Sequence, residues 1–297
     1  MTRWLWPLLA VCLGAIVPWT GCDDEAEVGD PRGSGQGATS GTGPAAGGGA
    51  PTETATCQGH IYACGDLQDN DNDGLLDSQD PDCLGPCDNT EDSLFGGIPG
   101  QPGPPCTLDC YFDQDSGAGN DDCYWNHACD THEQDPEYYP EPWLGSACAH
   151  DENANTPGTN KSCAELFAEQ STTCLDYCGP LTPNGCDCFG CCELPSGSGN
   201  FVWLGSEGAM GNSVCTHEAV GDPEVCHPCD PVDACLNGCG KCELCLGKTE
   251  LPPECFDPDG GGQQECPAGV QACGLPGQDP CPPGSYCITG CCQAVPE

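Results

Sequence analysis

The chain has 297 residues, of which 32 are Cys, 43 are Gly and 30 are Pro, while aliphatic residues are scarce. This composition disfavours the hydrophobic core of a TIM barrel, a Rossmann domain or a large enzyme. It predicts a small, disulfide-rich and mostly irregular fold in an oxidising compartment, with a short helix and short strands. The formal charge of −42 argues against nucleic acid and anionic lipid headgroups as partners. It favours cations or basic partners, or serves only to keep an extracellular protein soluble.

The N-terminal residues 1–21 predict an export signal. Arg3 precedes an uncharged and largely apolar stretch, residues 5–19. This stretch is barely long enough to span a membrane, and Pro7 and Pro18 weaken a spanning helix. Removal of the segment on export is therefore expected, and an uncleaved membrane anchor is the alternative.

The signal ends in Thr20-Gly21-Cys22, which resembles the lipobox of bacterial lipoproteins. The resemblance implies that Cys22 is lipidated and becomes the first residue of the mature chain. It also implies a location outside the cytoplasm, in a bacterial cell envelope, with a lipid anchor in the inner or the outer membrane; secretion without lipid is the alternative. Loss of Cys12 with the signal and use of Cys22 for lipid leave 30 cysteines, the even number that full pairing requires.

The composition changes along the chain and divides it into segments. Residues 22–56 are rich in Gly and nearly free of apolar side chains, which predicts a long, disordered tether. The cysteines that follow define an acidic segment at 57–99 and two cysteine-rich regions, at 100–195 and 196–297. Sequence alone does not determine how the cysteines pair.

An acidic loop is the feature that most clearly predicts a ligand. Asp69, Asp71 and Asp73 alternate along the chain, and Gly74 follows them. Calcium binds six to eight oxygens at short range, and Gly allows the sharp turn that such a loop needs. Further along, Asp77 and then Asp80 or Asp82 offer later ligands. The predicted calcium ligands are Asp69, Asp71, Asp73, Asp77 and Asp80.

The run from Cys64 to Cys83 resembles the calcium loops of thrombospondin type 3 repeats and a metal-binding repeat of bacterial surface proteins. That resemblance implicates Asp69, Asp71, Asp73 and Asp77 as calcium ligands. Cys64 and Cys83 flank the loop, and a bond between them would fix its ends. A solvated acidic turn without an ion is the alternative. The stretch between Asp113 and Asp122 offers a second, weaker oxygen site, which is left open.

One helix is predicted near 163–178. Ser162 and Glu165 have the spacing of a capping box, and Gly179-Pro180 ends the helix. Its apolar face, at helical spacing, comprises Cys163, Leu166, Phe167, Cys174, Tyr177 and Cys178. A short strand is predicted at 201–204, and the dense cysteines of 186–192 predict a disulfide knot without regular structure.

Other cysteine and histidine patterns allow metals but favour simpler roles. Cys239, Cys242 and Cys245 have the spacing of iron–sulfur ligands, but the expected fourth ligand is missing, so structural disulfides are predicted. Zinc or copper could bind at His127 and His132 or at His227, although each of these histidines also suits loop packing. No second His completes a zinc-protease motif, and no G-x-S-x-G sequence is present.

The sequence therefore favours a non-enzymatic, calcium-binding lipoprotein of the cell envelope. Its role would be structural or adhesive, with a protein or polysaccharide as surface partner. One alternative is an extracellular protein that sequesters copper or zinc through His and unpaired Cys. Another is an extracellular enzyme of unknown type, which the missing motifs and the thin core disfavour.

Overall fold

The computed structural model describes residues 51–57, 59–94, 106–113, 121–132, 148–206, 214–248, 250–256 and 266–295. The predicted signal, the lipidation site Cys22 and the tether up to residue 50 lie outside these ranges. All described residues belong to one unit, Gly43–Glu297. None of the helices in the described ranges is both long enough and apolar enough to cross a bilayer.

Fifteen disulfides form the framework of the fold. They pair every cysteine after Cys22, as the even number of these cysteines predicted. Each bond stays within one of four stretches, 57–87, 106–235, 239–255 and 266–292. Removal of one native disulfide from a small domain typically costs about 2–5 kcal/mol, so these bonds compensate for the scarcity of aliphatic side chains. The predicted disulfide-rich fold class is confirmed.

The predicted helix forms in two pieces, α1 (Cys163–Ala168) and α2 (Thr172–Tyr177). The capping box of Ser162 and Glu165 is present at the start of α1. The helix breaks because the Gln170 side chain bonds both backbone groups of Tyr124 and the carbonyl of Leu166, and Ser171 then caps α2. Tyr177, expected on the buried face, is exposed.

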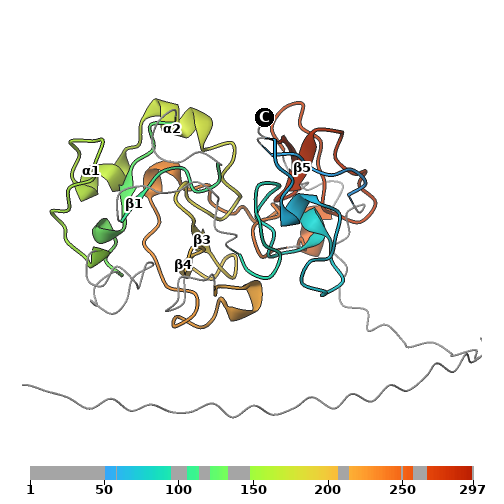
Figure 1. Cartoon of the computed structure of the whole chain (residues 1–297), viewed down its shortest axis with the longest axis horizontal. Helices are drawn as coiled ribbons and strands as arrows, with labels where there is room; N and C mark the ends of the chain where they lie inside the picture. The colour runs from blue at the N-terminus through green and yellow to red at the C-terminus, as the bar shows by residue number, and fades with distance from the viewer. Residues whose placement is uncertain are drawn as a thin grey trace, which may run out of the picture. The chain divides into compact units, whose positions relative to one another are not determined.

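Within the described ranges, the strands form three antiparallel pairs. Figure 1 labels both α-helices and four of these strands. The pairs are β1 (Thr107–Leu108) with β2 (Trp125–Asn126), β3 (Cys191–Glu193) with β4 (Phe201–Trp203), and β5 (Ser285–Ile288) with β6 (Cys291–Ala294). The strand predicted at 201–204 is confirmed. The segment 186–192 contains the expected close disulfide, Cys186–Cys192, but its last two residues also begin β3, which corrects the prediction of no regular structure.

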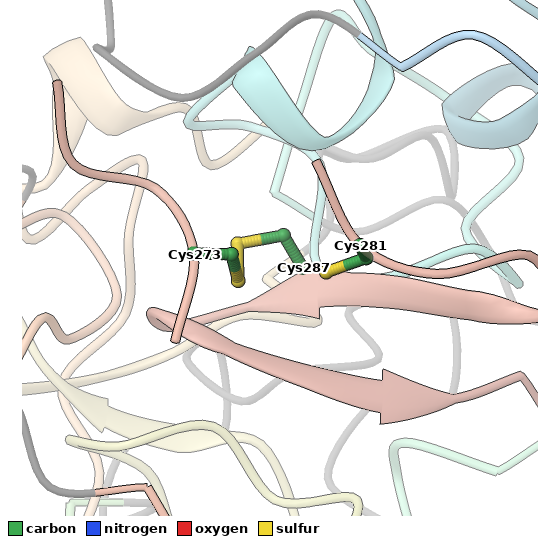
Figure 2. Close-up of side chains that lie close together, drawn as sticks. All are labelled: Cys273, Cys281 and Cys287. Carbon is green, nitrogen blue, oxygen red and sulfur yellow. A yellow bond between two sulfur atoms is a disulfide. The ribbon is translucent and has the colours of Figure 1, made fainter. Parts of the chain in front are cut away.

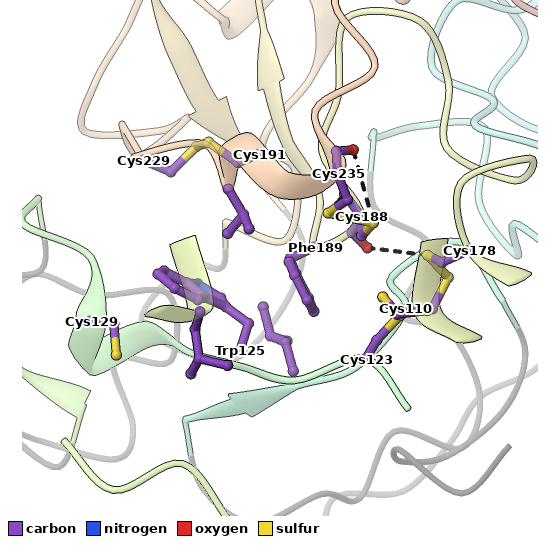
Figure 3. Close-up of a cluster of buried hydrophobic side chains, with 14 of the residues drawn as sticks. Cys110, Cys123, Trp125, Cys129, Cys178, Cys188, Phe189, Cys191, Cys229 and Cys235 are labelled. Atoms are coloured by element: carbon purple, nitrogen blue, oxygen red, sulfur yellow. Dashed lines mark hydrogen bonds between the residues drawn. A yellow bond between two sulfur atoms is a disulfide. The ribbon is translucent and has the colours of Figure 1, made fainter. Parts of the chain in front are cut away.

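The largest core cluster consists of a few aromatic and Leu side chains surrounded by cystines. Trp125 meets Phe167 edge to face at 4.5 Å and lies 6.2 Å from Phe189. Figure 3 shows Trp125 and Phe189 among disulfide sulfurs that come from many parts of the chain. Sulfur thus fills positions that Leu or Ile would occupy in an ordinary core.

Several contacts join the segments that the sequence suggested. The pair β3–β4 and the disulfides Cys188–Cys235 and Cys191–Cys229 connect the regions 100–195 and 196–297. A second core cluster contains Leu94 from the end of the acidic segment together with side chains of both regions. The acidic segment is therefore packed against the rest of the described unit.

Candidate metal centre

The acidic loop folds through hydrogen bonds between its own carboxylates and its backbone. Asp69 Oδ2 accepts the N–H of Gly74 at 3.1 Å, and Asp71 Oδ1 accepts the N–H of Asp73 at 3.0 Å. Asp73 Oδ1 accepts the N–H of Leu75 at 2.8 Å. Gly74 has φ +98°, a conformation that favours Gly. These local turns bring a carboxylate oxygen from each of the three Asp residues to within 4.8 Å of one another.

Asp80 lies near enough to this group for the charges of Asp73 and Asp71 to act on it, although it is not one of the three residues whose oxygens converge within 4.8 Å. Its side chain is 4% exposed, and its Oδ1 accepts the N–H of Asp82 at 2.7 Å. Its Oδ2 is buried and has no hydrogen-bond partner, and the same is true of Asp69 Oδ1. Burial, together with the negative charges of Asp73, Asp82 and Asp71, raises the pKa of Asp80 to about 7. Asp80 Oδ2 is thus a buried oxygen near other carboxylates, and burial of such a group without a donor or a cation is unfavourable.

Asp77 differs from the other four predicted ligands in its hydrogen bonds. It is 1% exposed, and its carboxylate accepts the N–H of Asp66 at 3.1 Å and that of Leu67 at 3.2 and 3.3 Å. Burial, opposed by these bonds, raises the pKa of Asp77 to about 6. Because both oxygens hold the backbone at the start of the loop, Asp77 is not among the ligands that we propose.

Two further features fix the loop. The disulfide Cys64–Cys83 joins its ends, as their flanking positions predicted. Glu91, which the sequence analysis missed, is 2% exposed and accepts the N–H groups of Asn70 at 2.6 Å and Asp77 at 2.8 Å. No motif marks Glu91, because it lies outside the repeat. Its carboxylate thus connects the backbone at Asn70 with the backbone at Asp77.

The charge around the loop is uncompensated. Residues 57–94 contain ten Asp or Glu and no Lys or Arg. Four of these carboxylates, those of Asp77, Asp80, Asp88 and Glu91, are more than nine-tenths buried. Buried carboxylates in proteins are usually paired with cations or coordinate metals. The ion pairs found in the described part of the chain all lie outside residues 57–94.

The other groups with metal-like spacing have different explanations. Cys273 and Cys287 form a disulfide, and the nearby Cys281 pairs with Cys292, so these sulfurs are not thiolates (Figure 2). Cys239, Cys242 and Cys245 are likewise in disulfides, as predicted. These sulfurs therefore have no thiolate to offer a metal.

The second acidic stretch is only partly described. Asp113 and Asp121 are buried beside Cys110, which is bonded to Cys178. The Asp121 carboxylate accepts the N–H groups of Cys110 and Cys123. Residues 114–120 lie outside the described ranges, so the weaker oxygen site suggested by the sequence remains a prediction.

The histidines considered as zinc or copper ligands lie in separate contacts. His127 is buried and packs edge to face on Trp203 at 4.7 Å. His132 Nε2 lies 3.3 Å from Asp230 Oδ1. His227 is largely buried, and burial lowers its pKa. The cysteines nearest to these histidines are all engaged in disulfides.

No protein-family model, no curated protein and no solved structure matches the chain. Among the described residues, the acidic loop brings three carboxylates together, those of Asp69, Asp71 and Asp73.

Proposed function

We propose that the acidic loop binds calcium through Asp69, Asp71, Asp73 and Asp80. The support is the convergence of the Asp69, Asp71 and Asp73 carboxylates within 4.8 Å, together with two buried oxygens that have no hydrogen-bond partner, Asp69 Oδ1 and Asp80 Oδ2. An all-oxygen site of this kind suits a hard cation. Calcium accepts an irregular shell of six to eight oxygens, so loop carbonyls or water would complete its coordination.

Calcium would serve here as a structural ion. It would neutralise the carboxylates that the fold holds together, and the Cys64–Cys83 disulfide would reduce the entropy cost of ordering the loop. We expect an affinity typical of extracellular calcium modules, with Kd about 10⁻⁴ to 10⁻³ M. Magnesium should compete poorly because it dehydrates reluctantly and demands a tighter octahedron.

We further propose that the protein is a non-enzymatic lipoprotein of a bacterial cell envelope, anchored at Cys22, with a structural or adhesive role. The density of disulfides favours an oxidising compartment, and the lipobox-like sequence supports the anchor. The acidic surface favours a cationic or calcium-bridged partner, of protein or polysaccharide. The alternative of copper or zinc capture needs free thiols, and pairing of every cysteine after Cys22 leaves none for it.

The metal proposal is tested by calorimetric calcium titration of the full chain and of Asp73→Ala. Asp92→Ala is the matched control, since Asp92 is an exposed carboxylate of the same segment that lies outside the loop. We expect one site in the parent and in Asp92→Ala, and strongly weakened binding in Asp73→Ala. Equal binding in parent and Asp73→Ala would mean that the loop is only an acidic turn.

The surface role is tested by capture of partners from intact envelopes with and without a calcium chelator. Release of the partners by the chelator would support calcium-dependent contacts. Magnesium added in place of calcium should restore the capture only at a far higher concentration than calcium does. Capture that is unaffected by the chelator would contradict them.

A further inference from the structure

The end of the acidic loop contacts a segment far away in the sequence. Asp82 follows the proposed ligand Asp80 by two residues, and its backbone N–H donates to Asp80 Oδ1 at 2.7 Å. The side chain of Asp82 accepts, through Oδ1, the backbone N–H of His217 at 2.8 Å, across a sequence separation of 135 residues. Asp82 therefore links Asp80 to His217 through one backbone bond and one side-chain bond.

The segment that carries His217 has its own covalent support. Residues 214–226 are closed by the disulfide Cys215–Cys226, and Thr216 caps the short helix η5 (His217–Ala219). The carbonyl of Cys215 also accepts the N–H of Leu94 at 2.9 Å. The segment 214–226 thus meets the acidic segment at two points, and it offers Asp82 a donor whose position is fixed.

These bonds determine which oxygen of Asp80 is engaged by the backbone and which is left without a partner. Because Oδ1 is engaged by the Asp82 N–H, Oδ2 is the oxygen left without a partner. If the Asp82 backbone moved, Asp80 would be free to turn and the fourth ligand would be lost. The anchor for that backbone is the Asp82 side chain on His217.

We infer that Asp82 is a positioning residue of the calcium site, and that calcium binding stabilises the contact between the loop and segment 214–226. This inference rests on the calcium site proposed above. By linkage, the factor by which an attached segment 214–226 strengthens calcium binding is also the factor by which calcium strengthens the attachment. The calcium-responsive unit therefore extends beyond the sequence repeat, to residues that no loop motif includes.

Two substitutions separate positioning from direct ligation. Asp82→Asn retains an oxygen that can accept the His217 N–H but removes the charge. Asp82→Ala removes both the acceptor and the charge. A positioning role predicts that only the alanine variant loses calcium affinity, whereas a direct carboxylate ligand would be lost in both variants.

The experiment is calorimetric calcium titration of the full-length parent, Asp82→Asn and Asp82→Ala. We expect Asp82→Ala to bind calcium about 10- to 100-fold more weakly, the range typical of residues that orient metal ligands. Asp82→Asn should remain within about threefold of the parent, less than a tenfold change that corresponds to 1.4 kcal/mol. Retained binding in Asp82→Asn also shows that position 82 tolerates substitution without loss of the fold.

Hydrogen exchange provides the second readout. Calcium should slow exchange of the His217 amide and its neighbours in 214–226 in the parent and in Asp82→Asn, but not in Asp82→Ala. Exchange in α1, which is remote from the loop in sequence and in its contacts, is the internal control.

Two results would overturn the inference. If calcium binding were weakened equally in both variants, Asp82 would be a ligand. If calcium binding were unchanged in Asp82→Ala, Asp82 would have no role in the site. Absence of calcium binding in the parent would instead show that the proposed function itself has failed.

Discussion

Replacement of Glu91 by Ala should weaken calcium binding although Glu91 is not a proposed ligand. The Glu91 carboxylate is buried and accepts the N–H of Asn70 at 2.6 Å and that of Asp77 at 2.8 Å. In the sequence these two donors lie on either side of Asp71 and Asp73, and Asn70 directly follows Asp69. Glu91 therefore keeps the loop in the conformation in which its carboxylates converge before any ion binds.

The magnitude follows from the two donors that lose the Glu91 carboxylate. A buried N–H that loses its acceptor costs about 1–3 kcal/mol. The Asp77 bond is buried, whereas Asn70 is exposed and its N–H can bond to water instead. The substitution therefore destabilises the ordered loop by about 1–3 kcal/mol. Calcium would then have to order the loop itself. A loss of this size corresponds to a Kd that is roughly 5- to 100-fold weaker.

Calorimetric titration with calcium measures this effect, and amide exchange at Asn70 and Asp77 should speed up in the calcium-free variant. Glu91→Gln, which keeps one acceptor oxygen, should lie between Glu91→Ala and the parent. Asp92→Ala removes a neighbouring exposed carboxylate and should bind as the parent does. If Glu91→Ala bound calcium within threefold of the parent, the reasoning about preorganisation would be refuted.

Three further predictions concern the anchor, the framework and pH. Cys22→Ser should release the protein from the membrane fraction or stall its processing; membrane association with residues 1–21 still attached would instead indicate an uncleaved anchor. Alkylation of the unfolded, unreduced protein should find few or no free thiols, and more than about four would favour metal capture. Burial raises the pKa of Asp187 to about 6, from an ordinary value of 3.8, so the folded state binds the proton more tightly. In calcium-free guanidinium unfolding, this group should therefore add stability as the pH falls through 6 towards 4, by about 3 kcal/mol in total. Asp187→Asn should lose this contribution, whereas replacement of the exposed Asp176 should not; an unchanged pH dependence in Asp187→Asn would contradict the assignment.

The parts of the site that could be predicted from the sequence are those set by short-range geometry. Asp69, Asp71 and Asp73 alternate in a tight turn that ends at Gly74, so their convergence follows from local backbone constraints. The density of cysteine likewise predicted the class of fold, because a chain with so few aliphatic residues needs covalent support.

The parts that could not be predicted depend on contacts between distant residues. Glu91 belongs to no motif, and only the folded chain brings its carboxylate to the N–H groups of Asn70 and Asp77. The bond between His217 and Asp82 spans two segments with no shared pattern. Similarly, the break between α1 and α2 depends on Gln170 bonding to Tyr124, a partner that helical periodicity cannot reveal. The pairing of the cysteines is unreadable for the same reason.

The most direct measurement of the central claim is an anomalous difference map from crystals of the protein grown in calcium. The account predicts one peak with carboxylate oxygens of Asp69, Asp71, Asp73 and Asp80 at about 2.3–2.6 Å, the usual calcium–oxygen distance. Asp77 should remain bonded to the backbone of Asp66 and Leu67, and Asp82 to His217. An empty loop at saturating calcium, or an ion bound elsewhere in the chain, would contradict the account.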